Sequence, residues 1–484
     1  MGNIDSKTII KVFCLIALFE LVSFCTHLAP GSINFAFIAL SVLFLIIALK
    51  NPSAALLISL AELFIGGKGY LFAIELDGAQ ISIRMAMFII LFAVWLISKI
   101  KNRSIALRKS RFFTAYVFLI ITIFLGLLNG LARSNGFADM FFDFNAYIFL
   151  AYLPIYYDFI KDKAAWGNVF NVFIAALVWL FIKTMIVLYF FSHALETAVW
   201  PIYHWIRNTG VGEITLMTAN IYRTFFQSHI YSLIGLVILT AVLILYRHKL
   251  NILQKKVVLI LMAICSAAVL ISLSRSFWAG ALCALLAILV LAFYKKIKIT
   301  RLLGRVFLGF FALAFGFVIL LAIVRFPIPE PTAGNLGSLL MQRSDISAEA
   351  AAASRWNLLP KLWQGIWKNP IIGTGFGAKI TYISNDPRVR AYSASGEYTT
   401  YAFEWGLLDI WYKIGLLGVL AYVWLILKII KQGIALYIKK EHIMPLALCA
   451  GLIALFTANF FTPYLNHPLG IGYIMLVSRY IDWT

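Results

Sequence analysis

Residues 257–294 read VVLILMAICSAAVLISLSRSFWAGALCALLAILVLAFY, which is two apolar runs joined by a short turn at Ser274-Arg275-Ser276. Each run approaches the roughly 20 residues that an α-helix needs to cross a hydrocarbon core. Basic residues flank both far ends of the pair, namely Arg247, Lys249, Lys255 and Lys256 before it and Lys295, Lys296, Lys298, Arg301 and Arg305 after it. Because basic residues beside spans mark the cytoplasmic side, the turn is predicted at the opposite, outer face. A cation is costly at that depth, so Arg275 is a candidate functional residue.

Apolar runs of this kind recur along the whole chain. Of its 484 residues, 62% are hydrophobic and 13% are charged, which is far outside the range of soluble domains. We predict an all-α fold, a polytopic membrane bundle of about 12–14 transmembrane helices. The predicted spans lie near residues 9–27, 33–49, 53–66, 84–99, 112–131, 143–160, 167–191, 229–246, 257–273, 276–294, 303–325, 409–430, 443–462 and 466–481. The runs 53–66 and 466–481 are short for a full crossing, and the loss of two adjacent spans would leave about twelve.

The basic residues also predict the orientation of the bundle. If Lys7 and Lys11 place the N-terminus inside and the spans alternate, the dense basic clusters all fall on the cytoplasmic side. They include Lys99, Lys101, Arg103, Arg108, Lys109 and Arg111, and near the end of the chain Lys428, Lys431, Lys439 and Lys440. Three regions follow: transmembrane helices in 1–325 with an outer loop at 192–228, a long outer loop at 326–408, and C-terminal transmembrane helices in 409–484.

The net charge of +21 does not indicate a nucleic-acid-binding protein, because most basic residues lie in loops between spans, where anionic lipid headgroups attract them. The five cysteines fall in apolar runs without metal-ligand spacing. The histidines are scattered, and none pairs with an acid at the spacing of a metal site. We therefore expect no metal and no cofactor.

The long loop contains a stretch with helical periodicity, SAEAAAASRWNLLPKLWQGIWKNP at 347–370. Ser347 is a plausible N-cap, Glu349 favours the first turn, and Pro360 is expected to kink the helix. An apolar stripe is formed by Trp356, Leu359, Trp363 and Trp367. Such a stripe fits a helix that lies on the membrane surface, and it equally fits one that packs on the outside of the bundle.

Four arginines fall on the predicted outer side: Arg207, Arg223, Arg275 and Arg355. A guanidinium group keeps its charge and binds phosphate in a bidentate manner, so arginines that converge from separate loops would form a diphosphate site. Arg223, Arg275 and Arg355 are the primary candidates, and Arg207 is a secondary one. The alternative is that each side chain snorkels to a lipid headgroup or caps a helix.

Acidic residues are few in the chain, and the stretch GEYTTYAFEWGLLDIWYKIGLLG at 396–418 contains three of them: Glu397, Glu404 and Asp409. Glu404 lies where the long loop re-enters the membrane, and we expect its carboxylate to be partly desolvated there. A carboxylate in that position is suited to take a proton from a hydroxyl group, so Glu404 is the candidate catalytic base. The alternative is an ion pair that anchors the loop to one of the arginines. Glu397 and Asp409 are secondary candidates.

Three motifs together resemble a known family. They are the turn SLSRSFWAG at 272–280, the phrase NPIIGTGFG at 369–377, and the re-entry Lys413-Ile414-Gly415-Leu416-Leu417-Gly418. This combination resembles the O-antigen ligase and O-antigen polymerase superfamily of bacterial inner-membrane glycosyltransferases, over roughly residues 215–430. Arg223 and Arg275 match arginines that are thought to hold a diphosphate in that family. Glu404 occupies the position of a histidine that is the proposed base in ligases, which favours a polymerase over a ligase.

The resemblance implies a GT-C-like membrane enzyme that transfers a glycan from undecaprenyl diphosphate to an acceptor at the periplasmic face without a metal. Its implied partners are the lipid-linked donor, a glycan acceptor, membrane lipids and a chain-length regulator. An O-antigen ligase that acts on lipid A-core or on protein is the first alternative. A non-enzymatic flippase or exporter is the second, but it needs a polar path through the bundle. The span interiors are nearly free of charge, with Glu20, Glu62 and Lys183 as the main exceptions.

Overall fold

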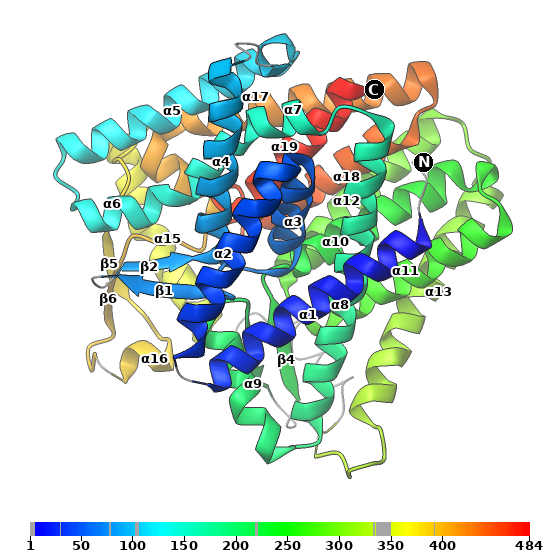
Figure 1. The fold of residues 1–484 in the computed structure, drawn as a ribbon, viewed down its shortest axis with the longest axis horizontal. Coiled ribbons are helices and arrows are strands. Elements are labelled where there is room, and N and C mark those ends of the chain that lie inside the picture. The colour runs from blue at the N-terminus through cyan, green and yellow to red at the C-terminus, as the bar shows by residue number, and fades with distance from the viewer. Residues whose placement is uncertain are drawn as a thin grey trace.

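The computed structural model describes residues 5–484, with gaps at residues 30, 77–78, 102–105, 218–220, 333, 335–349 and 392. The fold is an all-α membrane bundle, as predicted (Figure 1). Its α-helices are α1 (Ser6–Leu28), α2 (Ser32–Lys50), α3 (Pro52–Ile65), α4 (Ile83–Lys101), α5 (Phe113–Ala132), α6 (Phe137–Phe144), α7 (Leu153–Phe159), α8 (Lys163–Ser192), α9 (Glu196–Asn208), α10 (His229–Ala241), α11 (Ile252–Ile271), α12 (Arg275–Tyr294), α13 (Ile299–Val324), α15 (Ala350–Lys368), α16 (Pro387–Arg390), α17 (Gly406–Lys440), α18 (Ile443–Asn459) and α19 (Pro468–Trp483). Shorter helical turns are η1 (Ala106–Lys109), η2 (Asn145–Tyr152), η4 (Val242–Tyr246) and η5 (Arg247–Lys249).

Within the described residues, ten helices are long and apolar enough to cross a membrane. Every other run that was predicted to span is also helical, but shorter or interrupted. α3 and α18 are short apolar helices, and α19 has 16 residues. The predicted span at 143–160 is wrong as a single helix, because the chain there passes from α6 through the 3₁₀ helix η2 into α7.

The centre of the bundle is formed by α10, which packs against α11, α12 and α18. Its side chains are almost all buried, whereas α1, α2 and α13 present apolar side chains such as Leu18, Phe35 and Phe307 on the outside. An outward apolar face is what lipid tails require, and a helix that is apolar all round belongs in the interior. The buried position of α10 and the outer position of α1, α2 and α13 thus agree with a membrane bundle.

Two buried ion pairs account for the charges that the sequence places inside spans. Nζ of Lys183 lies 2.6 Å from Oε1 of Glu20, and Nε of Arg84 lies 2.7 Å from Oε2 of Glu62. Arg84 also donates to the backbone oxygen of Gly67. Buried charges are stable only when they are paired and hydrogen-bonded, so these residues join α1 to α8 and α3 to α4.

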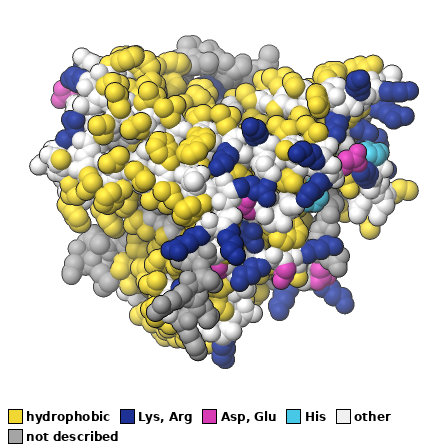
Figure 2. All heavy atoms as spheres, turned by 90° about the horizontal axis from the view of Figure 1, so that it is seen from above, with side chains coloured by type: hydrophobic (Ala, Val, Ile, Leu, Met, Phe, Trp, Pro, Cys, Tyr) yellow, Lys and Arg dark blue, Asp and Glu magenta, His cyan; other side chains and the backbone are white. Residues whose placement is uncertain are grey.

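Three antiparallel hairpins occupy the loops that were predicted outside the membrane. They pair β1 (Ala73–Leu76) with β2 (Ala79–Ser82), β3 (Gly212–Leu216) with β4 (Tyr222–Phe226), and β5 (Ile380–Ile383) with β6 (Glu397–Thr400). In Figure 1 they lie at the lower left and bottom with α9 and α16, while the C-terminus lies at the upper edge. Figure 2 shows the molecule from above, with many Lys and Arg side chains over the centre and right of that face.

The long loop at 326–408 packs onto the bundle through a small apolar core of its own. Leu358, Leu362 and Ile366 on α15 are buried against Ile380, Phe403 and Tyr412. The predicted tryptophan stripe lies on the other side of α15, where Trp356, Trp363 and Trp367 are exposed. Pro360 lies inside α15, and the kink expected at this residue stays a prediction. The predicted N-cap Ser347 and the acidic residue Glu349 lie outside the described residues.

Candidate functional site

The turn between α11 and α12 is held by its own serines. Ser272 donates to the backbone oxygen of Val269 at 2.6 Å, and the hydroxyl groups of Ser274 and Ser276 lie 2.9 Å apart. Leu273 is buried and adopts a left-handed backbone with φ of 48°. Such a conformation costs an ordinary residue about 1–2 kcal/mol, so the surrounding contacts must fix the turn. They place Arg275, which is half-buried, at the first position of α12.

Arg223 reaches this turn from β4. Its Nε donates to the backbone oxygen of Ser272 at 2.7 Å, and its guanidinium group lies 4.7 Å from the ring centroid of Phe225. The β3–β4 hairpin fixes the position of Arg223, because Arg223 pairs with Thr215 in the register of the strands. The loop at 192–228 is thus in direct contact with the turn at 272–276, which we call the serine-arginine turn. Both segments were predicted to supply arginines to the site.

The connection between α18 and α19, residues 460–467, covers the same turn. The hydroxyl groups of Ser276 and Thr462 lie 3.2 Å apart, and the ring of Tyr464 lies 6.1 Å from that of Phe277. Burial raises the pKa of Tyr464 well above its usual range, although the charge of Arg223 opposes that rise. Its hydroxyl group therefore stays protonated and donates to the backbone oxygen of Gln227 at 3.3 Å.

Glu404 lies two residues before α17 and forms an ion pair with Nε of Arg355. The side chains are 53% and 45% exposed, so the carboxylate is less desolvated than the sequence predicted. Trp405 donates to the backbone oxygen of Arg355 at 3.0 Å, and its ring lies 5.8 Å from that of Phe461. Phe461 adjoins Thr462, which contacts the serine-arginine turn. Glu404 and Arg355 are linked to Arg223 and Arg275 through this connection.

The three secondary candidates, Arg207, Glu397 and Asp409, lie in three different parts of the structure. Arg207 on α9 forms an ion pair with Glu213 at 3.5 Å and lies over the ring of Tyr203, so it holds α9 against β3. Glu397 is exposed on β6, opposite Ile383. Asp409 is buried on α17, where its Oδ1 lies 2.6 Å from Nζ of Lys413.

Lys413 lies at the centre of a buried ion-pair network that was not predicted from the sequence. Its ammonium group forms ion pairs with both Asp409 and Asp143, and all three side chains are buried. Asn466 donates to Oδ2 of Asp409 at 2.7 Å. The spacing of Asp409 and Lys413, four residues apart on one helix, would have indicated their pairing. Asp143 is on α6, and no pattern in the sequence connects it with α17.

The phrase at 369–377 packs into a kink of α17. Gly415 has φ of 72° inside that helix, which interrupts its hydrogen bonds. Thr374 and Gly375 donate their backbone N–H groups to the oxygens of Tyr412 and Lys413 at 2.7 and 2.9 Å, which replaces the lost bonds. Gly377 donates to Oδ2 of Asp143 at 2.9 Å. Two of the three motifs that suggested the family are therefore one structural unit.

These features define a multi-pass membrane protein whose loops at 192–228 and 326–408 bring arginine side chains and a carboxylate to one end of the bundle. Residues 257–423 match the family described as O-antigen ligase, and this segment contains Arg275, Arg355 and Glu404. Over this part of the chain the protein is similar to that family, and the match supports a role in glycan transfer. No curated protein matches the chain. Among the described residues, no group of His, Cys, Asp and Glu has the arrangement of a metal site.

Proposed function

We propose that the protein polymerises undecaprenyl-diphosphate-linked oligosaccharide repeat units at the periplasmic face of the bacterial inner membrane. The observation that carries this proposal is the bond from Arg223 to Ser272, which brings guanidinium groups from two separate loops to one turn. Two such groups at the membrane surface suit a diphosphate on a lipid carrier, since each guanidinium can bind two phosphate oxygens.

In the proposed reaction, an acceptor sugar hydroxyl attacks the anomeric carbon of the donor. The new bond joins the acceptor oxygen to that carbon, and the bond from the carbon to the diphosphate oxygen breaks. Glu404 takes the hydroxyl proton, and Arg223 and Arg275 stabilise the negative charge that grows on the leaving diphosphate. Direct displacement inverts the anomeric configuration, and no metal takes part in these steps.

The ion pair between Glu404 and Arg355 is compatible with this role. An ionised carboxylate can accept several hydrogen bonds, so a bond from Arg355 to Oε2 leaves capacity for a substrate hydroxyl. An exposed pair of this kind contributes only about 0–1 kcal/mol, so substrate binding can rearrange it at little cost. Arg355 can then turn from Glu404 to the diphosphate as the charge on the leaving group develops.

A ligase is the second candidate, because the matching family is described as O-antigen ligase. A ligase would transfer the same donor glycan to lipid A-core or to a protein. The position of Glu404, where the resembling ligases have histidine, favours the polymerase.

Reconstitution of the purified protein in liposomes separates these candidates. With the lipid-linked repeat unit as the only substrate, a polymerase produces a ladder of longer glycans and releases undecaprenyl diphosphate. A ligase produces a glycosylated product only after lipid A-core or an acceptor protein is added. A protein that moves the repeat unit across the bilayer without either product is an exporter, and that result would overturn the proposal.

A further inference from the structure

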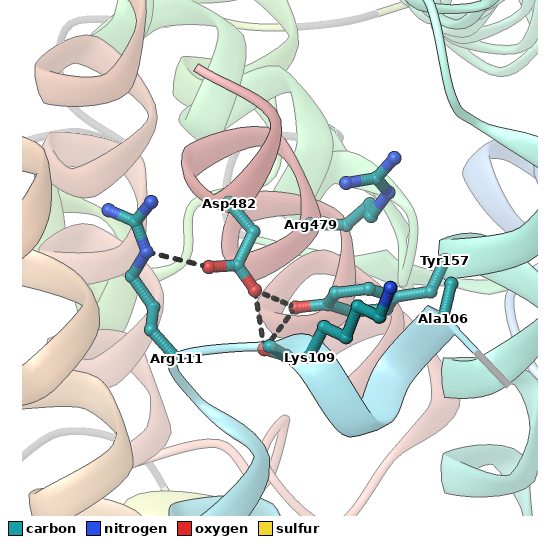
Figure 3. Close-up of a pocket in the computed structure, with 7 residues that line it drawn as sticks. Ala106, Lys109, Arg111, Tyr157, Arg479 and Asp482 are labelled. Atoms are coloured by element: carbon teal, nitrogen blue, oxygen red, sulfur yellow. Dashed lines mark hydrogen bonds and ion pairs between the residues drawn. The ribbon is translucent and has the colours of Figure 1, made fainter.

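A polar cavity lies at the end of the bundle that is predicted to be cytoplasmic. Its volume is about 270 Å³, and its lining includes Lys109, Ser110, Arg111, Tyr157, Arg479 and Asp482, which we call the cytoplasmic pocket (Figure 3). Lys109 and Arg111 belong to a basic cluster that the sequence places beside a span. The pocket is therefore built from η1 and the turn that follows it, from α7 and from the end of α19.

Asp482, the one carboxylate among these lining residues, is already satisfied by its neighbours. Nε of Arg111 lies 2.9 Å from its Oδ1, and Tyr157 donates its hydroxyl group to Oδ2 at 2.6 Å. Ser110 also donates to Oδ2. The side chain of Asp482 is 7% exposed, so this arrangement fixes the floor of the cavity and leaves Asp482 little capacity for another cation.

Arg479 is placed differently. Its guanidinium group lies 5.1 Å from the ring centroid of Tyr157, and its Nε is buried. No residue in the described part of the chain accepts a hydrogen bond from that Nε. The neighbouring carboxylate Asp158 is paired with Lys99 at 2.9 Å and accepts a bond from Trp95. Figure 3 shows the guanidinium group directed away from Asp482.

The charges on the lining therefore do not balance. Lys109, Arg111 and Arg479 are cations, and Asp482 is the one anion among the lining residues, which leaves an excess of two positive charges. A buried guanidinium Nε without an acceptor is unfavourable, and an anionic ligand with several oxygens would satisfy it. Phosphate has this chemistry, and the headgroup layer of a membrane supplies it at the depth where these helices end.

We propose that the cytoplasmic pocket binds a phosphate group, supplied by the headgroup of an anionic phospholipid. Arg479 is the main ligand, with Lys109 at the exposed rim. The site is separate from the proposed glycan-transfer site, which lies at the other end of the bundle. Lipid binding here would hold η1, α7 and α19 together at the cytoplasmic surface.

The experiment titrates the full-length protein, purified in an uncharged detergent, with short-chain phosphatidylglycerol and separately with inorganic phosphate. The midpoint of thermal unfolding and native mass spectrometry report binding. The wild type should show a saturable rise of the midpoint with phosphatidylglycerol. Arg479→Gln should weaken that response by about tenfold or more, because it removes a charge-assisted hydrogen bond. Lys109→Gln should weaken it several-fold, and Lys256→Gln, a control on the same face outside the pocket, should not.

Two further results decide the source of the phosphate. An equal response to inorganic phosphate that also depends on Arg479 supports the phosphate site and assigns it to a soluble anion. A response that is the same in wild type, Arg479→Gln and Lys256→Gln overturns the proposal. If Arg479→Gln does not fold, Lys109→Gln and Arg479→Lys still test it, because Lys109 is exposed and Lys keeps the charge without the planar group.

Discussion

Two groups of ion-paired residues meet near the start of α17, and they differ in environment. Arg355 and Glu404 are 45% and 53% exposed, whereas Lys413, Asp143 and Asp409 are 3%, 7% and 1% exposed. Breaking a buried group leaves an unpaired charge without water, which costs several kcal/mol, but an exposed pair opens at little cost. The comparison indicates that the buried network holds the fold, and that the exposed pair can exchange partners with a substrate.

The largest effect is expected for the buried network. Lys413→Met should destabilise the protein by about 3–5 kcal/mol, because Asp143 and Asp409 lose their common partner. The midpoint of thermal unfolding in detergent measures the effect, and Lys431→Met, an exposed change on the same helix, is the control. If both variants unfold at the wild-type temperature, the network has no structural role.

The stability of the protein should be nearly as sensitive to substitutions in the glycine-rich segment 369–377, which adjoins this network. Gly375 has φ of +83°, and an added Cβ would lie 2.2 Å from the backbone nitrogen of Gly130. Gly375→Ala should therefore cost about 2–4 kcal/mol through backbone strain and overpacking. Gly304→Ala is the matched control, since no atom lies within 4 Å of its Cβ position. Equal stability of the two variants would show that the close packing of Gly375 against Gly130 on α5 is wrong.

A smaller effect, on rate instead of stability, is expected at the serine-arginine turn. Arg275→Lys keeps the charge but loses the planar donor group, and we expect polymerisation to slow by about 10- to 100-fold. Initial rates of polymerisation in liposomes measure this effect. Arg207→Lys is the control, because Arg207 on α9 is already paired with Glu213 on β3. A wild-type rate for Arg275→Lys would make Arg275 a structural residue.

The smallest change in stability is expected for the exposed pair. Arg355→Gln should alter stability by less than about 1 kcal/mol, since both partners remain solvated. The rate of polymerisation should fall several-fold if Arg355 assists the diphosphate. Thermal unfolding and initial rates on the same preparation test both parts. A loss of stability as large as that of Lys413→Met would remove the distinction between the two groups.

Much of this architecture could be predicted from the sequence. The apolar runs predicted the helices, because that signal is local. The outer position of Arg275, predicted from the basic clusters around 247–256 and 295–305, stays a prediction. The meeting of Arg223 with the serine-arginine turn was also expected, and the bond to Ser272 agrees with that expectation. Whether these arginines bind a diphosphate stays a prediction.

The parts that could not be predicted depend on contacts between distant segments. Asp143 reaches Lys413 from a helix about 270 residues earlier in the chain, and one sequence carries no signal for that approach. The break of 143–160 into three helical pieces is equally hidden, since its composition is that of a continuous span. For Glu404, the sequence left open both a base and an ion pair, and the structure shows the pair.

The most direct test of the comparison is the rate of polymerisation by Glu404→Gln on the purified lipid-linked repeat unit. The account predicts a folded protein with the wild-type unfolding temperature and a rate that is lower by about 100- to 10,000-fold, because the amide cannot accept the hydroxyl proton. A folded Glu404→Gln protein that extends glycans at the wild-type rate would contradict the assignment of the exposed carboxylate as the base.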